Sequence, residues 1–293
     1  MDWSQALDRL FLFLVLICGF VGAGAAADPE SFIIARAGNL PILLTAPHGG
    51  LDGISGVAMR RHGTTTADAH TIELTENLAT QLQMALGAQP YVVAARFSRK
   101  YIDANRVEAE AFDSPEAKPL YDMYHDRIRL FIREIRQRFP QGALLLDIHG
   151  QSDDPSVVHR GTRNGTTVAA LNRTHGPAAL IGTTSVLGAL QGKGYKVFPP
   201  NTPIGNPPED RRFNGGYTVH AYGSSNADGI DAIQIEIGRN LRTDSSFIAA
   251  LGEAIVVFYR SYLVANAPAH SMVPNPPMQG TVESGASLAF ARP

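Results

Sequence analysis

Cysteine is nearly absent from the chain, which has one such residue, Cys18, among 293. A single thiol excludes a disulfide framework and any zinc site that is built from several thiolates. An excess of basic residues is also lacking, since 25 lysines and arginines stand against 27 acidic residues. This balance gives no reason to expect a protein that binds a nucleic-acid backbone. With 44% apolar and 18% charged residues, the composition is that of a globular protein.

Two common catalytic motifs are missing as well. No G-x-S-x-G pattern occurs, which disfavours a serine hydrolase with a nucleophile elbow. The segment Gly188–Lys193 is one residue short of a P-loop and lacks the following Ser or Thr. The sequence therefore argues against nucleotide hydrolysis.

The N-terminal segment contains an apolar run, Leu10–Val21, that is shorter than the roughly 20 residues needed to span a bilayer. Small residues follow and end in an A-x-A pattern at Ala27. The pattern predicts a signal peptide over residues 1–27 and a secreted or periplasmic protein with no membrane span after cleavage; an uncleaved anchor is the alternative. Residues 28–265 contain no linker and predict a single domain, and residues 266–293 predict a disordered, Pro-rich tail.

The pattern of apolar residues predicts an alternation of strands and helices. One amphipathic helix follows Asp68 and a second spans about Pro115 to Phe139, and a third helix is expected near Ser246–Leu263. Runs rich in β-branched residues and leucine predict five buried strands: Phe32–Arg36, Ile42–Ala46, Tyr91–Arg96, Ala143–Ile148 and Ala232–Ile237. The expected fold is α/β, with helices on both faces of a largely parallel sheet.

Polar residues collect where three of these strands end. His48 and His149 each follow a hydrophobic strand and precede a glycine, and Glu236 lies near the end of a third strand. In α/β sheets, ligands bind beyond the carboxyl ends of the strands, so these side chains are expected to share one site. Two imidazoles and a carboxylate suit a catalytic zinc that keeps one position open for water. The glycines would allow backbone and substrate to approach the metal.

The third metal ligand has several candidates. Asp68 is preferred, although its position before a helix is equally typical of an N-cap. Asp52 lies four residues after His48 and is also possible. Glu73 is less favoured because it lies on the polar face of its helix, and His70 ranks below Asp68.

Two carboxylates on these strands have further predicted roles. Asp147 lies on the same strand face as His149 and could accept the second ring N–H of a ligand histidine. Glu236 shares its strand face with Gln234, whereas isoleucines occupy the other face. A carboxylate inside so hydrophobic a strand is costly unless it is paired or catalytic, so we expect Glu236 to act as a general base.

Two loops could contact a substrate. The segment Arg96–Arg106 follows a strand and contains Arg99, Asn105 and Arg106; an arginine fixed near a metal can bind a substrate carboxylate or steady an oxyanion. A solvated loop is the simpler interpretation for Arg99. The segment Phe213–Tyr217, with Gly216 and Tyr217, is a flexible aromatic loop that could line the same pocket.

Taken together, the order and spacing of six segments resemble the N-formylglutamate amidohydrolase family, within the zinc carboxypeptidase-like superfamily, between about Leu40 and Leu263. The segments are PHGG at Pro47–Gly50, ADAHTIELTENLA at Ala67–Ala79, SRKYIDANR at Ser98–Arg106, LLLDIHG at Leu144–Gly150, FNGGY at Phe213–Tyr217 and GIDAIQIEIGRNLR at Gly229–Arg242.

The resemblance implies a mixed sheet of about eight strands in a three-layer αβα fold. It also implies one Zn²⁺ per chain, held by His48, His149 and an acidic ligand between them, with Asn105 and Arg106 for substrate and Glu236 as base. The sequence departs from the carboxypeptidase pattern at Leu51, where a metal-binding Glu would stand three residues after His48. It also has His70 where related proteins tend to carry Asn.

The implied activity is hydrolysis of an amide in a small N-acyl amino acid. N-formylglutamate hydrolysis belongs to intracellular histidine breakdown, so the predicted export implies a different substrate, such as another N-acyl amino acid or a peptide end. The alternative from another functional class is a secreted binding protein that has lost its metal. Retention of His48, His149, Arg106 and Glu236 argues against that alternative.

Overall fold

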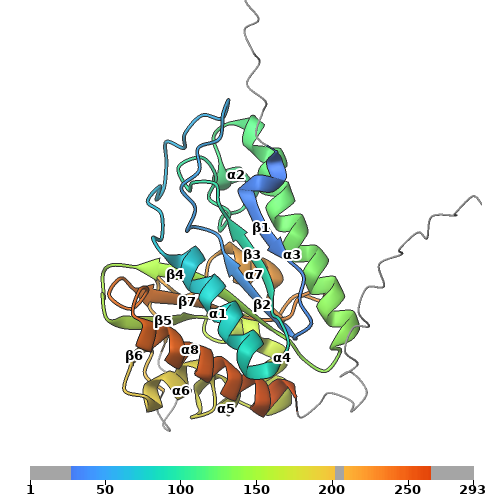
Figure 1. Ribbon diagram of the computed structural model, residues 1–293, viewed down its shortest axis with the longest axis vertical. Helices are drawn as coiled ribbons and strands as arrows, with labels where there is room; N and C mark the ends of the chain where they lie inside the picture. The colour runs from blue at the N-terminus through green and yellow to red at the C-terminus, as the bar shows by residue number, and fades with distance from the viewer. Residues whose placement is uncertain (1–27, 202–207, 265–293) are drawn as a thin grey trace, which may run out of the picture.

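The computed structural model describes residues 28–201 and 208–264 (Figure 1). The predicted signal peptide, residues 1–27, and the predicted tail, residues 266–293, lie outside the described residues. The limits of the predicted single domain therefore stay a prediction.

A seven-stranded sheet forms the centre of the molecule, with the strand order β1-β3-β2-β4-β7-β5-β6. Strands β2, β3, β4 and β7 run parallel, as do β5 and β6, whereas β1 is antiparallel to β3 and β5 is antiparallel to β7. This confirms the predicted mixed, largely parallel sheet. The strands are β1 (Ile33–Arg36), β2 (Ile42–Ala46), β3 (Tyr91–Ala95), β4 (Leu144–Gln151), β5 (Val157–Gly161), β6 (Lys196–Phe198) and β7 (Asp231–Gly238).

Helices cover both faces of this sheet (Figure 1). On one face α1 (Thr71–Leu86) buries Leu74, Leu78 and Leu82 in a cluster shared with α8 (Ser245–Phe258). On the other face α3 (Lys118–Arg138) packs Tyr124 and Ile128 against the strands. Alternate residues of β2 belong to opposite clusters, as expected for a strand buried on both sides.

The remaining helices are short. They are α2 (Glu108–Ala111), α4 (Ala169–His175), α5 (Ala178–Ile181), α6 (Val186–Gly192) and α7 (Tyr217–Tyr222), with 3₁₀ turns at Pro29–Phe32, Pro115–Ala117 and Thr166–Val168 and a π turn at Tyr259–Leu263. Of the described helices, α8 with its final turn (Ser245–Leu263) is long and apolar enough to cross a membrane. More than half of that stretch is buried inside the fold, as in the core helix of a globular domain.

The register of the three central strands brings the polar residues together. Thr45 on β2 is paired with Asp147 on β4, which is paired in turn with Gln234 on β7. Two residues further along, His149 lies beside Glu236. Because residues two apart on a strand share a face, these polar side chains lie on one face at the carboxyl end of the parallel strands. Strand β4 continues through His149 to Gln151, three residues beyond the predicted end.

Candidate metal centre and active site

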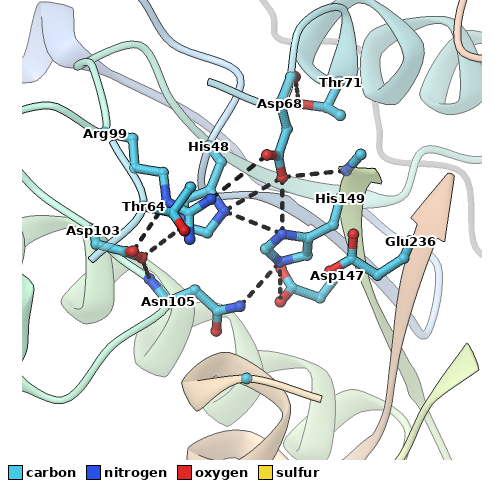
Figure 2. A network of polar contacts seen from close by, with 12 residues as sticks. His48, Thr64, Asp68, Thr71, Arg99, Asp103, Asn105, Asp147, His149 and Glu236 are labelled. Carbon is cyan, nitrogen blue, oxygen red and sulfur yellow. Dashed lines mark hydrogen bonds and ion pairs between the residues drawn. The ribbon is translucent and has the colours of Figure 1, made fainter. Parts of the chain in front are cut away.

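Three ligand-type atoms converge at this end of the sheet (Figure 2). The Nδ1 atoms of His48 and His149 lie 3.2 Å apart. The Oδ2 atom of Asp68 lies 3.1 Å from Nδ1 of His149 and 3.4 Å from Nδ1 of His48. All three residues are buried. They form the one group of at least three His, Cys, Asp or Glu side chains in metal-binding arrangement within residues 28–201 and 208–264.

The other nitrogen of each imidazole faces a buried carboxylate. Nε2 of His48 lies 2.7 Å from Oδ1 of Asp103, and Nε2 of His149 lies 3.0 Å from Oδ2 of Asp147. A carboxylate accepts hydrogen bonds, so in a neutral ring the proton resides on Nε2 and the lone pair on Nδ1. In that tautomer the lone pairs of the two Nδ1 atoms and the Asp68 carboxylate oxygen face one another. Such a cluster can hold a cation at its centre.

The spacing of these atoms fits zinc. Zn²⁺ binds His nitrogen and Asp oxygen at about 2.0–2.2 Å, which separates neighbouring ligands of a tetrahedral ion by about 3.3 Å. The three observed separations, 3.2, 3.1 and 3.4 Å, agree with that value. A carboxylate behind each histidine is the usual way to fix the tautomer of a ligand imidazole. The donor set thus fits a zinc-type ion, whereas the identity of the metal stays a prediction.

Among the acidic candidates, Asp68 is the one that reaches the histidines. The loop after β2 folds back so that its two ends meet. At that point the backbone N–H of Asp68 donates to the carbonyl of His48 at 2.9 Å. The N-cap alternative is wrong, because His70 occupies the N-cap of α1 and the Asp68 carboxylate instead accepts from the backbone N–H of Gly150. Asp52, Glu73 and His70 are exposed and lie outside the group of converging ligand atoms.

The glycines beside the histidines are required by packing. A Cβ atom at Gly49 would lie 2.6 Å from Thr71 Oγ1, and one at Gly150 would lie 2.3 Å from the guanidinium of Arg242. The missing side chains thus make room for the start of α1 and for Arg242. They serve the packing of protein segments around the site, and the predicted approach of backbone and substrate to a metal stays a prediction.

Asp103 is a residue of the candidate site that sequence reasoning missed. Asp103 is fully buried, and its carboxylate faces Nε2 of His48. The same carboxylate lies 3.0 Å from Nε of Arg99 and 3.6 Å from Arg60. Burial alone would raise the pKa of Asp103, but His48 and the two arginines outweigh burial and hold that pKa well below its usual range. The available signal was an acidic residue between two apolar ones in the segment Tyr101–Ala104, which leads into Asn105 and Arg106.

Asp68 is held as an anion in a similar way. Burial opposes its charge, but the adjacent imidazoles of His149 and His48 outweigh burial, so the pKa of Asp68 lies well below its usual range. The second carboxylate oxygen of Asp68 lies 3.6 Å from Arg99. Arg99 therefore bridges Asp68 and Asp103, and its side chain is 11% exposed. It lines the cavity, as a substrate-binding residue must, but its visible contacts hold the two carboxylates.

Glu236 is a residue of β7 and lies beside the three converging residues. Its carboxylate accepts one hydrogen bond from Nε2 of Gln234 at 2.8 Å. Burial raises the pKa of Glu236, and the neighbouring His149 partly offsets that effect. A buried carboxylate whose pKa is moved towards neutrality, next to a metal-type cluster, has the chemistry of a proton acceptor.

The three converging residues and Glu236 line an open cavity of about 670 Å³. Asn105, Arg106 and Gly216 also line this cavity. Nδ2 of Asn105 lies 3.1 Å from Nε2 of His149, and its Oδ1 accepts from the backbone of Thr218. Gly216 must be a glycine, because a Cβ there would lie 2.2 Å from Asn105. Arg106 is exposed on the cavity wall, where it is accessible to a bound molecule.

Tyr217 is placed differently from the prediction. Its ring packs edge-on against His125 of α3, with ring centres 5.4 Å apart, and Tyr217 is not among the residues that line the cavity. Tyr217 is the first residue of α7. The predicted substrate contact of Tyr217 is thus corrected to a packing contact.

Comparison with known proteins agrees with the fold and the motifs. Residues 115–242 match the family model of N-formylglutamate amidohydrolase. The N-formylglutamate amidohydrolase of Ralstonia eutropha JMP134 superposes with a TM-score of 0.53 at 19% identity, covering 79% of this chain and 97% of that one. Gene product Atu2144 of Agrobacterium tumefaciens has a TM-score of 0.53 at 17% identity, covering 80% and 95%. No curated protein sequence matches the chain. The family resemblance found in the motifs is confirmed.

The comparisons correct the predicted location. The family model and a structural neighbour are named N-formylglutamate amidohydrolase, and no comparison supports export. The prediction of a secreted or periplasmic protein is therefore wrong. It depended on the apolar run and the A-x-A pattern at Ala27, although the charges before the run are unfavourable for a signal peptide, since Asp2 and Asp8 oppose Arg9. The cleavage predicted after Ala27 lies outside the described residues.

Proposed function

Because residues 115–242 match the N-formylglutamate amidohydrolase family, we propose that this chain is a metal-dependent amide hydrolase. It removes an acyl group of the formyl type from an amino acid or cleaves a peptide end. The observation that carries the metal dependence is the convergence of His48 Nδ1, His149 Nδ1 and Asp68 Oδ2 within 3.4 Å of one another. The alternative, a metal-free binding protein, lacks support once the acidic third member of the cluster is present.

In this proposal His48, Asp68 and His149 hold one zinc ion per chain. When bound, the ion supplies Lewis acidity towards the amide carbonyl and lowers the pKa of water. Asp103 and Asp147 keep the proton of each imidazole on Nε2 and leave Nδ1 free for the metal.

Glu236 moves the protons of the reaction. It accepts one proton from the attacking water and later delivers it to the amine nitrogen, so hydrolysis yields a carboxylic acid and a free amine. Burial favours this role, because it raises the pKa of Glu236 towards the range in which a carboxylate can both take and return a proton.

Arg106 orients the substrate. Its guanidinium is exposed on the cavity wall and can hold a substrate carboxylate through two parallel hydrogen bonds. Asn105 lies between His149 and Gln234 and supports the wall that carries Gly216.

The test combines metal analysis with an activity assay. The purified chain is expected to contain about one metal ion, by elemental analysis, and to hydrolyse N-formyl or N-acetyl amino acids. Activity should disappear with a chelator and return with zinc. A chain that binds no metal, or one whose hydrolysis survives complete removal of metal, would overturn the proposal.

A further inference from the structure

A second large cavity lies at the opposite end of the sheet from the three converging residues. It has a volume of about 660 Å³ and is lined by the chain that precedes β4, by α4 and by the chain that leads into β7. Asp231, the first residue of β7, lies on its wall, whereas Glu236 is near the far end of the same strand. At about 3.3 Å per residue, these two positions are roughly 17 Å apart. Among the described residues, none lines both cavities.

A buried carboxylate lies on the wall of this second cavity. Asp231 is 6% exposed, and its Oδ1 accepts hydrogen bonds from the backbone N–H of Leu171 at 3.0 Å and from the hydroxyl of Ser224 at 2.5 Å. Its Oδ2 accepts no hydrogen bond from residues 28–201 or 208–264. A buried carboxylate with an unused oxygen is costly in free energy unless a positive group pairs with it. The wall therefore offers an acceptor for a ligand cation.

Basic side chains line the same cavity. Burial raises the pKa of Asp231, and Arg173 and His175 of α4 are near enough to offset part of that effect. Arg173 is exposed, and in the part of the chain that the structure describes no carboxylate lies within ion-pair distance of it. The cavity thus presents a carboxylate and a guanidinium that are close to each other but not paired. A small molecule that carries both a positive and a negative group would satisfy both.

The loop that leads into β7 holds its shape without a ligand. Nδ2 of Asn226 donates to the carbonyl of His220 at 2.7 Å and thereby closes the loop on the end of α7. Gly229 lies so near the preceding turn that a Cβ atom there would be 2.1 Å from the carbonyl oxygen of Gly223. A wall that is ordered before binding lowers the entropy cost of holding a ligand.

Aromatic side chains provide the apolar part of the cavity. Phe139 and Tyr262 both line it. The ring of Tyr262 packs edge-on against His175, with ring centres 5.3 Å apart, and its hydroxyl lies 2.6 Å from Oγ1 of Thr184. The volume lies within the range of about 300–1,000 Å³ that is typical of small-molecule sites. There is consequently room for a large side chain beside the two charged groups.

We infer that this cavity is a second ligand site, which binds a free amino acid with an apolar side chain. Asp231 binds its ammonium group, Arg173 binds its carboxylate, and Phe139 and Tyr262 contact its side chain. The inference does not rest on the proposed function, because none of these residues belongs to the candidate active site.

The test is calorimetry on the full chain with three probes that share one side chain. They are L-phenylalanine, L-phenylalaninol, which lacks the carboxylate, and 3-phenylpropanoate, which lacks the ammonium group. We expect L-phenylalanine to bind at least about tenfold more tightly than either other probe. Arg173→Gln should weaken L-phenylalanine by at least about tenfold and change L-phenylalaninol by less than about twofold, because that probe has no carboxylate to lose.

Asp231→Asn is the reciprocal variant. It should weaken L-phenylalanine by at least about tenfold and leave 3-phenylpropanoate within about twofold of the parent protein. Since Asp231 also holds Ser224 and the start of α4, this variant can fail to fold. Arg173 is exposed and has no such contact, so Arg173→Gln then decides the inference by itself.

Arg106→Gln is the matched control, because it removes an exposed arginine from the other cavity. Binding of L-phenylalanine should stay within about twofold of the parent in this variant. The inference is overturned if the parent binds no probe or binds all three equally. It is also overturned if Arg173→Gln binds L-phenylalanine like the parent, since the amino acid then occupies another site. An equal loss in Arg173→Gln and Arg106→Gln would indicate a diffuse charge effect and overturn it as well.

Discussion

The Nδ1 atoms of His48 and His149 lie 3.2 Å apart, although 101 residues separate them in sequence. Both rings have their second nitrogen committed to a buried carboxylate, Asp103 for one and Asp147 for the other. In the tautomer that these carboxylates favour, two lone pairs face each other, and a bound cation would remove their repulsion. If the cluster holds a metal, as proposed, we expect the stability of this part of the fold to depend on metal binding.

Metal removal is expected to destabilise the protein. A ligand that binds only the folded state adds about 4 kcal/mol when its free concentration is 1,000-fold above Kd. Thermal unfolding should therefore occur at a lower temperature after chelation and recover with zinc. The variant His149→Ala should lose both the metal and this zinc-dependent stabilisation, measured by elemental analysis and by a melting curve.

The control for that variant is His70→Asn. His70 is exposed, has left-handed backbone geometry that asparagine accepts, and lies outside the cluster. It should retain about one metal per chain. Equal metal content in His149→Ala and in the parent protein would show that the ligand set is misassigned.

Glu236→Gln separates catalysis from metal binding. The amide has the size of the carboxylate but cannot accept a proton from water, so kcat should fall by about 10²–10⁴-fold. Metal content should stay near that of the parent, because Glu236 is not one of the three converging residues. Glu73→Gln, on the exposed side of α1, is the matched control and should leave kcat unchanged. Retention of parent-like turnover by Glu236→Gln would remove this residue from the mechanism.

Asp103→Asn tests whether the carboxylate behind His48 contributes to metal affinity. Substitution of a residue that orients a metal ligand typically weakens metal binding by about 10–100-fold. We expect that loss here, because the amide no longer fixes the proton on Nε2 of His48 and leaves Arg99 without one of its partners. Competition with a chromophoric chelator measures the affinity. An unchanged affinity would mean that Asp103 supports the fold alone.

Much of the central layer was predictable from the sequence, because parallel strands buried on both faces leave continuous apolar runs. His48, His149 and Glu236 were recognisable because they are polar residues at or near the ends of these apolar runs. Strand β5 was missed because His159 and Arg160 interrupt its apolar pattern, although both are buried and paired in the fold. Strand β6 has only three residues and gives no periodic signal.

The supporting contacts of the site could not be predicted in the same way. Asp103 lies 55 residues from His48 in sequence, and its role depends on a loop whose path is set by tertiary contacts. Thr162 and Asn164 likewise meet Glu209 only through the packing of two irregular segments. Local sequence patterns report periodic burial, whereas these contacts depend on where non-periodic segments return to the sheet.

His125 provides a prediction about acid stability that does not depend on the metal. It is 1% exposed on α3, and Nδ1 lies 2.9 Å from the hydroxyl of Tyr222. Burial, reinforced by the positive charge of Arg129, lowers the pKa of His125 from 6.5 to about 3. In the unfolded chain His125 therefore binds a proton below pH 6.5, whereas in the folded chain it stays neutral down to about pH 3. The contribution of neutral His125 to the free energy of unfolding is fully present above pH 6.5. It falls as the pH drops from 6.5 towards 3, by up to about 1.4 kcal/mol per pH unit.

The variant His125→Gln should remove that contribution, because glutamine has no proton to gain. Urea unfolding of the metal-free parent and variant at pH 7.0, 6.0 and 5.0 measures the difference. The gap in unfolding free energy between the two proteins should narrow, or reverse in favour of the variant, as the pH falls. Since the carboxylates and the other histidines titrate alike in both proteins, their effects cancel in the comparison. A gap that stays constant across this range would show that the pKa of His125 is the same in the folded and the unfolded chain despite its burial.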